Sequence, residues 1–201
     1  MLDAKREIFR GAEEKVGKFF SSFSLTPNEY TLLSIVFALI SFFYLAMGKI
    51  ILALLFFLFA SFLDFIDGAV ARYKNLATKK GAYVDTIADR FVEAILLLGL
   101  LFLGLPEVFL PAYIWIFLIL FGSMMTTYVK AAAKEKDLVS DELKGGLLAR
   151  GERLILIIVS LIVGIFSLSG TVYILILVAI LSNFTVFQRI YSALRKNNIE
   201  K

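Results

Sequence analysis

Residues 50–71 read IILALLFFLFASFLDFIDGAVA, and this stretch decides the fold. It carries no cation and only two carboxylates, Asp64 and Asp67. An α-helix of roughly 20 apolar residues crosses a hydrocarbon core of about 30 Å, so the stretch is long enough to span a membrane. Because an aspartate inside such a helix costs about 2.5–3.5 kcal/mol, both carboxylates need a functional reason.

The composition of the whole chain also places it in a membrane. Of the 201 residues, 60% are hydrophobic, and the mean hydropathy is +0.85, which exceeds what a soluble domain tolerates on its surface. Backbone amides in lipid need internal partners, and the apolar runs are too long and continuous for barrel strands. We therefore predict one all-α integral membrane domain, 1–201, with a six-helix transmembrane bundle over 27–192, whose spans lie at 27–48, 50–71, 82–104, 108–133, 147–168 and 171–192.

Cap and turn residues set the limits of these helices. Thr26, a candidate N-cap, precedes Pro27 at a position where a missing N–H costs nothing, so the first span begins near Pro27. Glycine, proline and serine predict short outer turns at 48–49, 104–111 and 167–170. The inner connections, 73–80 and 134–146, are longer and polar, which places the available chemistry on that side of the membrane.

The amino-terminal residues 2–20 interleave charged and apolar side chains. This pattern predicts an amphipathic helix lying on the membrane surface, and a solvated leader is the alternative. The first twenty residues contain no apolar core of a removable signal peptide, so we expect the segment to be retained.

The cations indicate the orientation, because cytoplasmic loops collect Lys and Arg. Five precede the first span, four lie between 72 and 80, four between 134 and 150, and three after 194, whereas the opposite connections carry only Lys49. The pattern predicts a multi-pass protein of the cell (cytoplasmic) membrane, with both termini and the active site on the cytoplasmic side. A basic rim and a pI near 9.2 suit anionic lipid headgroups, and nucleic acid is not an expected partner.

A second acidic pair follows the first. Asp64 and Asp67 lie three residues apart at the end of their span, and Asp85 and Asp89 lie four apart at the start of the next. Each spacing puts a pair on one helical face, and antiparallel spans bring both pairs to the same end of the bundle. Clustered carboxylates need a cation, and an all-oxygen ligand set in a chain without His or Cys favours Mg²⁺ or Mn²⁺, with two ions expected. A general base must then be a carboxylate or, less easily, Lys or Tyr.

Small residues accompany the acids. Gly68 and Ala71 fall on the Asp64 face, and Gly81 lies one turn before Asp85, so they leave open volume beside the carboxylates. Arg72 adds a planar fork that suits phosphate oxygens. Close packing between helices is the alternative explanation for the small residues.

Together these residues spell Asp64-x2-Asp67-Gly68-x2-Ala71-Arg72-x8-Gly81-x3-Asp85-x3-Asp89. The motif resembles, at all eight fixed positions, the signature of the CDP-alcohol phosphotransferase family, and the six spans and the amphipathic amino-terminal segment resemble the family too. The resemblance implies an enzyme that moves a substituted phosphate from a CDP-linked lipid to an alcohol and releases CMP. It also implies a homodimer with its site in a polar cavity at the cytoplasmic membrane boundary.

The resemblance further implies a role for each matching residue. Asp64, Asp67 and Asp85 correspond to metal ligands, and Asp89 to a further ligand and the general base. The residues implied in binding CDP are Gly68, Ala71, Arg72 and Gly81, with Asn28 and Thr31 from a Thr-Pro-Asn-x2-Thr stretch similar to one in several members.

An acceptor that itself carries a phosphate would need cations beyond those that serve CDP. The candidates near the helix ends are Lys130, Arg150, Arg153 and Arg189. Snorkelling anchors are the alternative. The stretches 128–130, 149–154 and 188–189 resemble those of phosphatidylinositol-phosphate synthases and of their archaeal ether-lipid counterparts, the archaetidylinositol-phosphate synthases. This implies inositol 1-phosphate as acceptor, bound by Lys130, Arg153 and Arg189, and CDP-archaeol or CDP-diacylglycerol as donor. Ala132 is a departure, because some relatives carry arginine there.

Other functions remain as alternatives. A phosphatidylglycerophosphate-type synthase using glycerol 3-phosphate, or an enzyme using CDP-inositol as donor, would keep the same motif. An intramembrane aspartyl protease needs one aspartate per helix in Tyr-Asp and Gly-x-Gly-Asp contexts that this chain lacks. A cation transporter could hold carboxylates at mid-depth, but we see no internal repeat.

Overall fold

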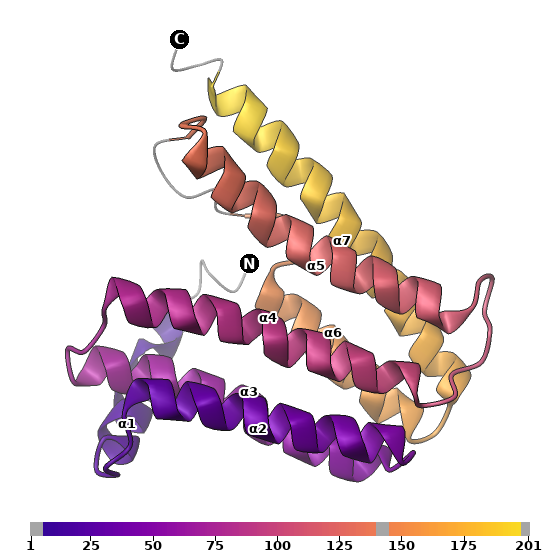
Figure 1. Cartoon of the computed structure of the whole chain (residues 1–201), viewed down its shortest axis with the longest axis horizontal. Helices are drawn as coiled ribbons and strands as arrows, with labels where there is room; N and C mark the ends of the chain where they lie inside the picture. The colour runs from indigo at the N-terminus through magenta and orange to yellow at the C-terminus, as the bar shows by residue number, and fades with distance from the viewer. Residues whose placement is uncertain (1–5, 140–144, 198–201) are drawn as a thin grey trace. The chain divides into compact units, whose positions relative to one another are not determined.

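The computed structural model describes residues 6–139 and 145–197, and in this part of the chain every regular element is an α-helix (Figure 1). The helices are α1 Arg6–Phe20, α2 Pro27–Ala46, α3 Ile50–Tyr73, α4 Lys79–Leu101, α5 Ala112–Glu135, α6 Arg150–Gly164 and α7 Leu168–Asn197. The predicted all-α class is confirmed. Residues 2–5 of the predicted surface helix and residues 140–144 of the predicted inner connection lie outside the described residues.

The chain forms two compact units, Met1–Gly104 and Leu105–Lys201. In the first unit, α2 packs against α3 and α4, and α1 packs against α3. In the second unit, α7 packs against both α5 and α6. Small residues let the helices approach closely: a Cβ on Gly99 would lie 2.8 Å from Leu45 Cδ1, and a Cβ on Gly122 would lie 2.9 Å from Ser182 Cβ.

The start of α2 follows the predicted cap. The Glu29 carboxylate accepts hydrogen bonds from the Thr26 backbone N–H at 2.6 Å and from the Thr26 hydroxyl at 2.8 Å. Pro27 occupies the first helical position, as predicted. These two bonds from Thr26 to Glu29 stabilise the turn that leads from α1 into α2.

Several predicted helix limits were wrong; the helix expected over 82–104, for example, runs from Lys79 to Leu101. The helix expected from residue 108 begins at Ala112, because residues 108–110 form an antiparallel bridge. The helix expected from 147 begins at Arg150, since Gln188 and Thr185 of α7 accept the backbone N–H groups of residues 147 and 148. The outer turn expected over 167–170 is shorter, because α7 already begins at Leu168.

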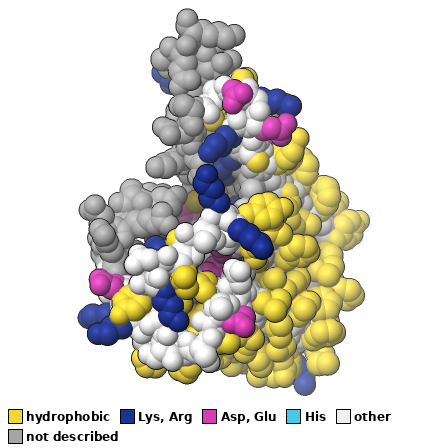
Figure 2. Space-filling view, turned by 60° about the vertical axis from the view of Figure 1, so that its left-hand side comes forward, with side chains coloured by type: hydrophobic (Ala, Val, Ile, Leu, Met, Phe, Trp, Pro, Cys, Tyr) yellow, Lys and Arg dark blue, Asp and Glu magenta, His cyan; other side chains and the backbone are white. Residues whose placement is uncertain are grey.

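Among residues 6–139 and 145–197, four helices are long and apolar enough to cross a membrane: α2, α3, α5 and the Leu168–Arg195 part of α7. Large hydrophobic side chains remain exposed on them, among them Phe43, Phe59, Phe117 and Phe187, and hydrophobic side chains cover a wide part of the surface in Figure 2. Such a surface belongs in lipid rather than in water. The protein is therefore an all-helical membrane protein.

Candidate active site

Three carboxylates of the first unit come together. Asp64 and Asp67 belong to α3, and Asp85 belongs to α4. One carboxylate oxygen from each of the three lies within 4.8 Å of the other two. Asp67 is only 4% exposed, while the other two are half-buried. Asp89 lies one turn beyond Asp85 on α4 and is buried. The structure thus brings together three of the four acids that the sequence singles out.

Asp67 is oriented by a neighbour on another helix. The Thr31 hydroxyl of α2 lies 2.6 Å from Asp67 Oδ2 and donates to it, and both side chains are buried. A charge-assisted hydrogen bond of this length holds the carboxylate in one rotamer. Thr31, which the resemblance assigns to the nucleotide, therefore also positions a carboxylate of the cluster.

A cavity of about 330 Å³ opens beside the cluster. Eight of the residues predicted for the site line it: Asn28, Thr31, Asp67, Gly68, Ala71, Arg72, Gly81 and Asp85. The lining also includes residues that the sequence reasoning missed, namely Thr26, Pro27, Leu76, Ala77, Thr78 and Ala82. Thr78 is the N-cap of α4, whose hydroxyl accepts from the Gly81 N–H at 3.0 Å, and a threonine just before a helical run is the sequence signal that could have identified it.

The glycines of the cavity do not serve close packing of helices. The atoms nearest to a Cβ on Gly68 would be those of the Arg72 guanidinium, at 3.0 and 3.3 Å. On Gly81 the nearest would be the Thr78 hydroxyl, at 3.2 Å. Both neighbours belong to the lining of the cavity, so the glycines keep its wall open.

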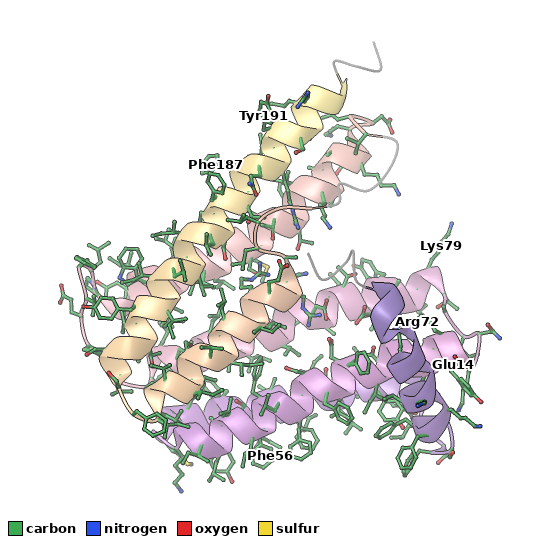
Figure 3. All side chains as sticks on the ribbon, turned by 180° about the vertical axis from the view of Figure 1, so that it is seen from behind. Glu14, Phe56, Arg72, Lys79, Phe187 and Tyr191 are labelled. Atoms are coloured by element: carbon green, nitrogen blue, oxygen red, sulfur yellow. The ribbon has the colours of Figure 1, made fainter. Side chains whose placement is uncertain are left out.

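Arg72 reaches from the rim of the cavity to α1. Its guanidinium forms an ion pair with Glu13, and Figure 3 shows Arg72 beside α1. The sequence reasoning did not anticipate this pair, because residues 59 positions apart meet only once α1 has packed against α3.

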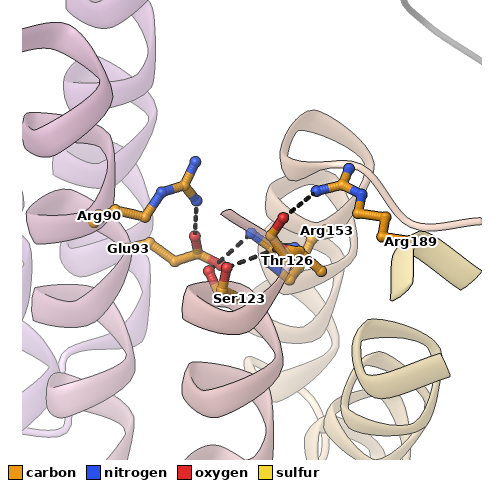
Figure 4. Close-up of polar contacts among 6 residues, drawn as sticks. All are labelled: Arg90, Glu93, Ser123, Thr126, Arg153 and Arg189. Atoms are coloured by element: carbon orange, nitrogen blue, oxygen red, sulfur yellow. Dashed lines mark hydrogen bonds and ion pairs between the residues drawn. The ribbon is translucent and has the colours of Figure 1, made fainter. Parts of the chain in front are cut away.

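The cations of the second unit gather around α5. Arg153 of α6 is 1% exposed and donates to the Ser123 hydroxyl at 2.8 Å, and Arg189 of α7 donates to the Thr126 carbonyl at 2.7 Å (Figure 4). Lys130 is half-buried and lies on the same α5 face, since Ser123, Thr126 and Lys130 are spaced three and four residues apart. Arg150 is half-buried at the first position of α6. Burial of Arg153 and Arg189 argues against the snorkelling alternative for these two.

A buried carboxylate of α4 was also missed by the sequence reasoning. Glu93 is fully buried and pairs with Arg90 at 3.3 Å (Figure 4). It lies one turn beyond Asp89, so the acidic side of α4 extends further into the helix than the eight-residue motif indicates.

The fold and the site define a membrane-embedded protein with a cluster of three carboxylates beside a cavity. The chain belongs to the CDP-alcohol phosphatidyltransferase family, which it matches over residues 24–190. It is therefore an enzyme, a transferase that moves a substituted phosphate from a CDP-linked lipid to an alcohol.

Several relatives share most of its length. The archaetidylinositol phosphate synthase of Pyrococcus horikoshii is 33% identical over 199 residues, which cover 98% of each chain. The phosphatidylinositol phosphate synthase of Corynebacterium glutamicum is 33% identical over 155 residues, covering 74% of this chain and 68% of that one.

Solved structures of the Mycobacterium tuberculosis phosphatidylinositol phosphate synthase are similar as well. The one with CDP-DAG bound has a TM-score of 0.78 at 25% identity, covering 90% of this chain and 92% of that chain. The one in complex with manganese and citrate has a TM-score of 0.79 at 26% identity, covering 90% and 88%.

Proposed function

We propose that this enzyme transfers the lipid-bearing phosphate of CDP-archaeol or CDP-diacylglycerol to inositol 1-phosphate and releases CMP. The observation that carries the proposal is the meeting of Asp64, Asp67 and Asp85 beside a cavity lined by the rest of the motif. The proposed acceptor is supported by the relatives, which are named as synthases of inositol-containing phospholipids.

The carboxylate cluster fits a divalent cation. Three carboxylate oxygens within 4.8 Å of one another repel each other unless a cation lies among them, and oxygen donors suit Mg²⁺ or Mn²⁺. We propose two ions, held by Asp64, Asp67 and Asp85 with Asp89 as a further ligand. When bound, they supply positive charge to the pyrophosphate and to the departing CMP.

We propose one set of residues that binds the CDP-linked donor and one residue that accepts the proton of the acceptor hydroxyl. The residues proposed to hold the CDP moiety are Gly68, Ala71, Arg72 and Gly81, with Asn28 and Thr31. That all six line the same cavity supports this role. Asp89 takes the proton of the acceptor hydroxyl, whose oxygen bonds to the lipid-bearing phosphorus while the bond from that phosphorus to CMP breaks. A carboxylate base is consistent with a chain that has no histidine.

The acceptor phosphate is assigned to Lys130, Arg153 and Arg189, with Arg150 nearby in the chain. The hydrogen bonds that bring Arg153 and Arg189 to the α5 face of Lys130 support this assignment. Burial of the two arginines adds support, because a buried guanidinium strengthens binding of an anion.

For the arrangement in the membrane, we propose six spans, both termini in the cytoplasm, and α1 as the interfacial helix. Helices α4 and α6 are the weaker spans: α4 carries charged residues in its first half, and α6 has only 15 residues, about 22 Å of helix.

We further propose that both units form one catalytic domain within a homodimer in the cytoplasmic membrane. The family match from residue 24 to 190 supports the single domain, since it includes parts of both units.

An acceptor assay tests the function. Purified enzyme receives CDP-archaeol or CDP-diacylglycerol, Mg²⁺ and one of inositol 1-phosphate, glycerol 3-phosphate or serine, and CMP release is measured. We expect release with inositol 1-phosphate. Release only with glycerol 3-phosphate would identify a phosphatidylglycerophosphate-type synthase, release only with serine would also overturn the proposed acceptor, and a cation transporter would release no CMP.

A further inference from the structure

The ion pair between Arg72 and Glu13 joins the cavity to the amino-terminal helix. Arg72 lines the cavity, whereas Glu13 belongs to α1 and does not appear in the lining. The Glu13 side chain is 19% exposed and that of Arg72 47%. The carboxylate is therefore the more enclosed partner, and the guanidinium reaches toward it from the rim.

Helix α1 is held in place by contacts that do not involve Glu13. A Cβ on Gly17 would lie 2.6 Å from the Ala69 carbonyl oxygen, so α1 approaches the backbone of α3 directly. The Phe20 ring packs edge-on against Tyr30 and Phe62, at 6.2 and 5.8 Å between centroids. The Tyr30 hydroxyl also donates to the Phe20 carbonyl at 3.1 Å. The position of the Glu13 carboxylate is thus set by the anchoring of α1.

The guanidinium also lies against Gly68, one turn earlier on α3. Because Gly68 has no side chain, Arg72 curls back over it, and a Cβ there would lie 3.0 Å from Nη2. Arginine presents five N–H donors in a planar fork, a shape that matches the oxygens of both carboxylates and phosphates. Glu13 pairs with the guanidinium, and the missing side chain of Gly68 leaves room for it.

We propose that Glu13 is a positioning residue of the donor site, which aims the Arg72 guanidinium at the diphosphate of the CDP-linked lipid. This inference rests on the proposed function, in which Arg72 binds CDP. A long arginine side chain at a half-exposed rim loses rotamer entropy on binding an anion, and a fixed carboxylate removes part of that cost beforehand. The surface helix α1 is then a part of the donor site.

The test compares Glu13→Gln with the matched control Glu14→Gln, its exposed neighbour on α1. The KM values for the CDP-linked lipid and for the acceptor are measured on the full chain in detergent, together with the Tm. Glu13→Gln should raise the KM for the CDP-linked lipid by about threefold to fivefold, with the acceptor KM and the Tm unchanged. Glu13→Asp should restore part of the loss, and Glu14→Gln should match the wild type.

A double-mutant cycle decides whether the effect acts through Arg72. In an Arg72→Gln background, Glu13→Gln should add nothing to the KM for the CDP-linked lipid. A full threefold rise in that background would overturn the proposal, as would an unchanged or lowered KM in the single variant, or equal rises in both KM values.

Failure of this inference is distinguishable from failure of the proposed function. The assay uses whichever acceptor supports CMP release, so a wrong acceptor leaves the test intact. If no acceptor supports release, the proposed function is overturned, and the dissociation constant of free CDP then decides the inference. Weaker binding of CDP by Glu13→Gln than by wild type supports it, and equal binding overturns it.

Discussion

The Thr31 hydroxyl of α2 donates a 2.6 Å hydrogen bond to the Asp67 carboxylate of α3. Both residues are buried, each with 4% of its surface exposed. This bond ties the carboxylate cluster to the helix whose first turn lines the cavity. The Thr31 hydroxyl oxygen also lies 3.1 Å from the Pro27 carbonyl oxygen, so a backbone group of its own helix also contacts it. The cluster is therefore organised by three helices, α2, α3 and α4.

Removing this hydroxyl should loosen Asp67. Thr31→Val keeps the shape of the side chain but leaves a buried carboxylate without this donor, so we expect CMP release to fall about tenfold and the metal concentration for half-maximal activity to rise. Thr31→Ser, which keeps the hydroxyl, should retain most activity. Similar metal dependence in the Val and Ser variants would contradict the positioning role.

Neutralising a member of the cluster should remove activity. Asp64→Asn, Asp67→Asn and Asp85→Asn keep the volume but remove the charge that binds a cation, so we expect CMP release to fall at least about a hundredfold. Glu135→Gln, at an exposed surface ion pair, is the control and should retain wild-type turnover. Full activity of any of the three Asn variants would exclude that residue as an essential ligand.

Metal removal should stop turnover without unfolding the helices. We expect EDTA to abolish CMP release and either Mg²⁺ or Mn²⁺ to restore it, because the cluster consists of carboxylate oxygens. Circular dichroism of the same samples should show unchanged helicity. Turnover that persists in EDTA would argue against metal-dependent transfer.

The buried arginines of the second unit should act on the acceptor. Arg153→Lys and Arg189→Lys keep a positive charge but lose the planar fork, so we expect the KM for inositol 1-phosphate to rise about tenfold or more while the KM for the CDP-linked lipid stays unchanged. Lys134→Ala, at an exposed position of α5, is the control. Equal loss of affinity for both substrates would assign the arginines a structural role.

The contact between α1 and α3 should depend on one glycine. A Cβ on Gly17 would lie 2.6 Å from the Ala69 carbonyl oxygen, so Gly17→Ala should destabilise the packing of α1 by about 1–3 kcal/mol and lower the Tm in detergent. The matched control is Gly11→Ala on the same helix, because its added Cβ would meet no described atom within 4 Å beyond its own turn of helix. The control should leave the Tm unchanged or raise it slightly, since alanine favours a helix. A Tm for Gly17→Ala equal to that of the control would show that α1 does not need this close approach.

The sequence by itself determined the class of the protein and the core of its motif. Lipid allows few backbone solutions, so a run such as residues 50–71 predicts a membrane helix without knowledge of its neighbours. Local chemistry also predicted the start of α2 at Pro27, because a cap depends on residues three positions apart. The helical period alone places Asp64 and Asp67 on one face of their helix, and Asp85 and Asp89 on one face of the next.

Only the tertiary structure decided how helices meet. The Thr31 bond to Asp67 and the Arg72 pair with Glu13 depend on the rotation and axial position of one helix against another, which periodicity does not fix. The late start of α6 at Arg150 has a similar cause, since side chains of α7 take the backbone N–H groups of residues 147 and 148. Local signals are read within one turn of helix, whereas these contacts join residues more than thirty positions apart.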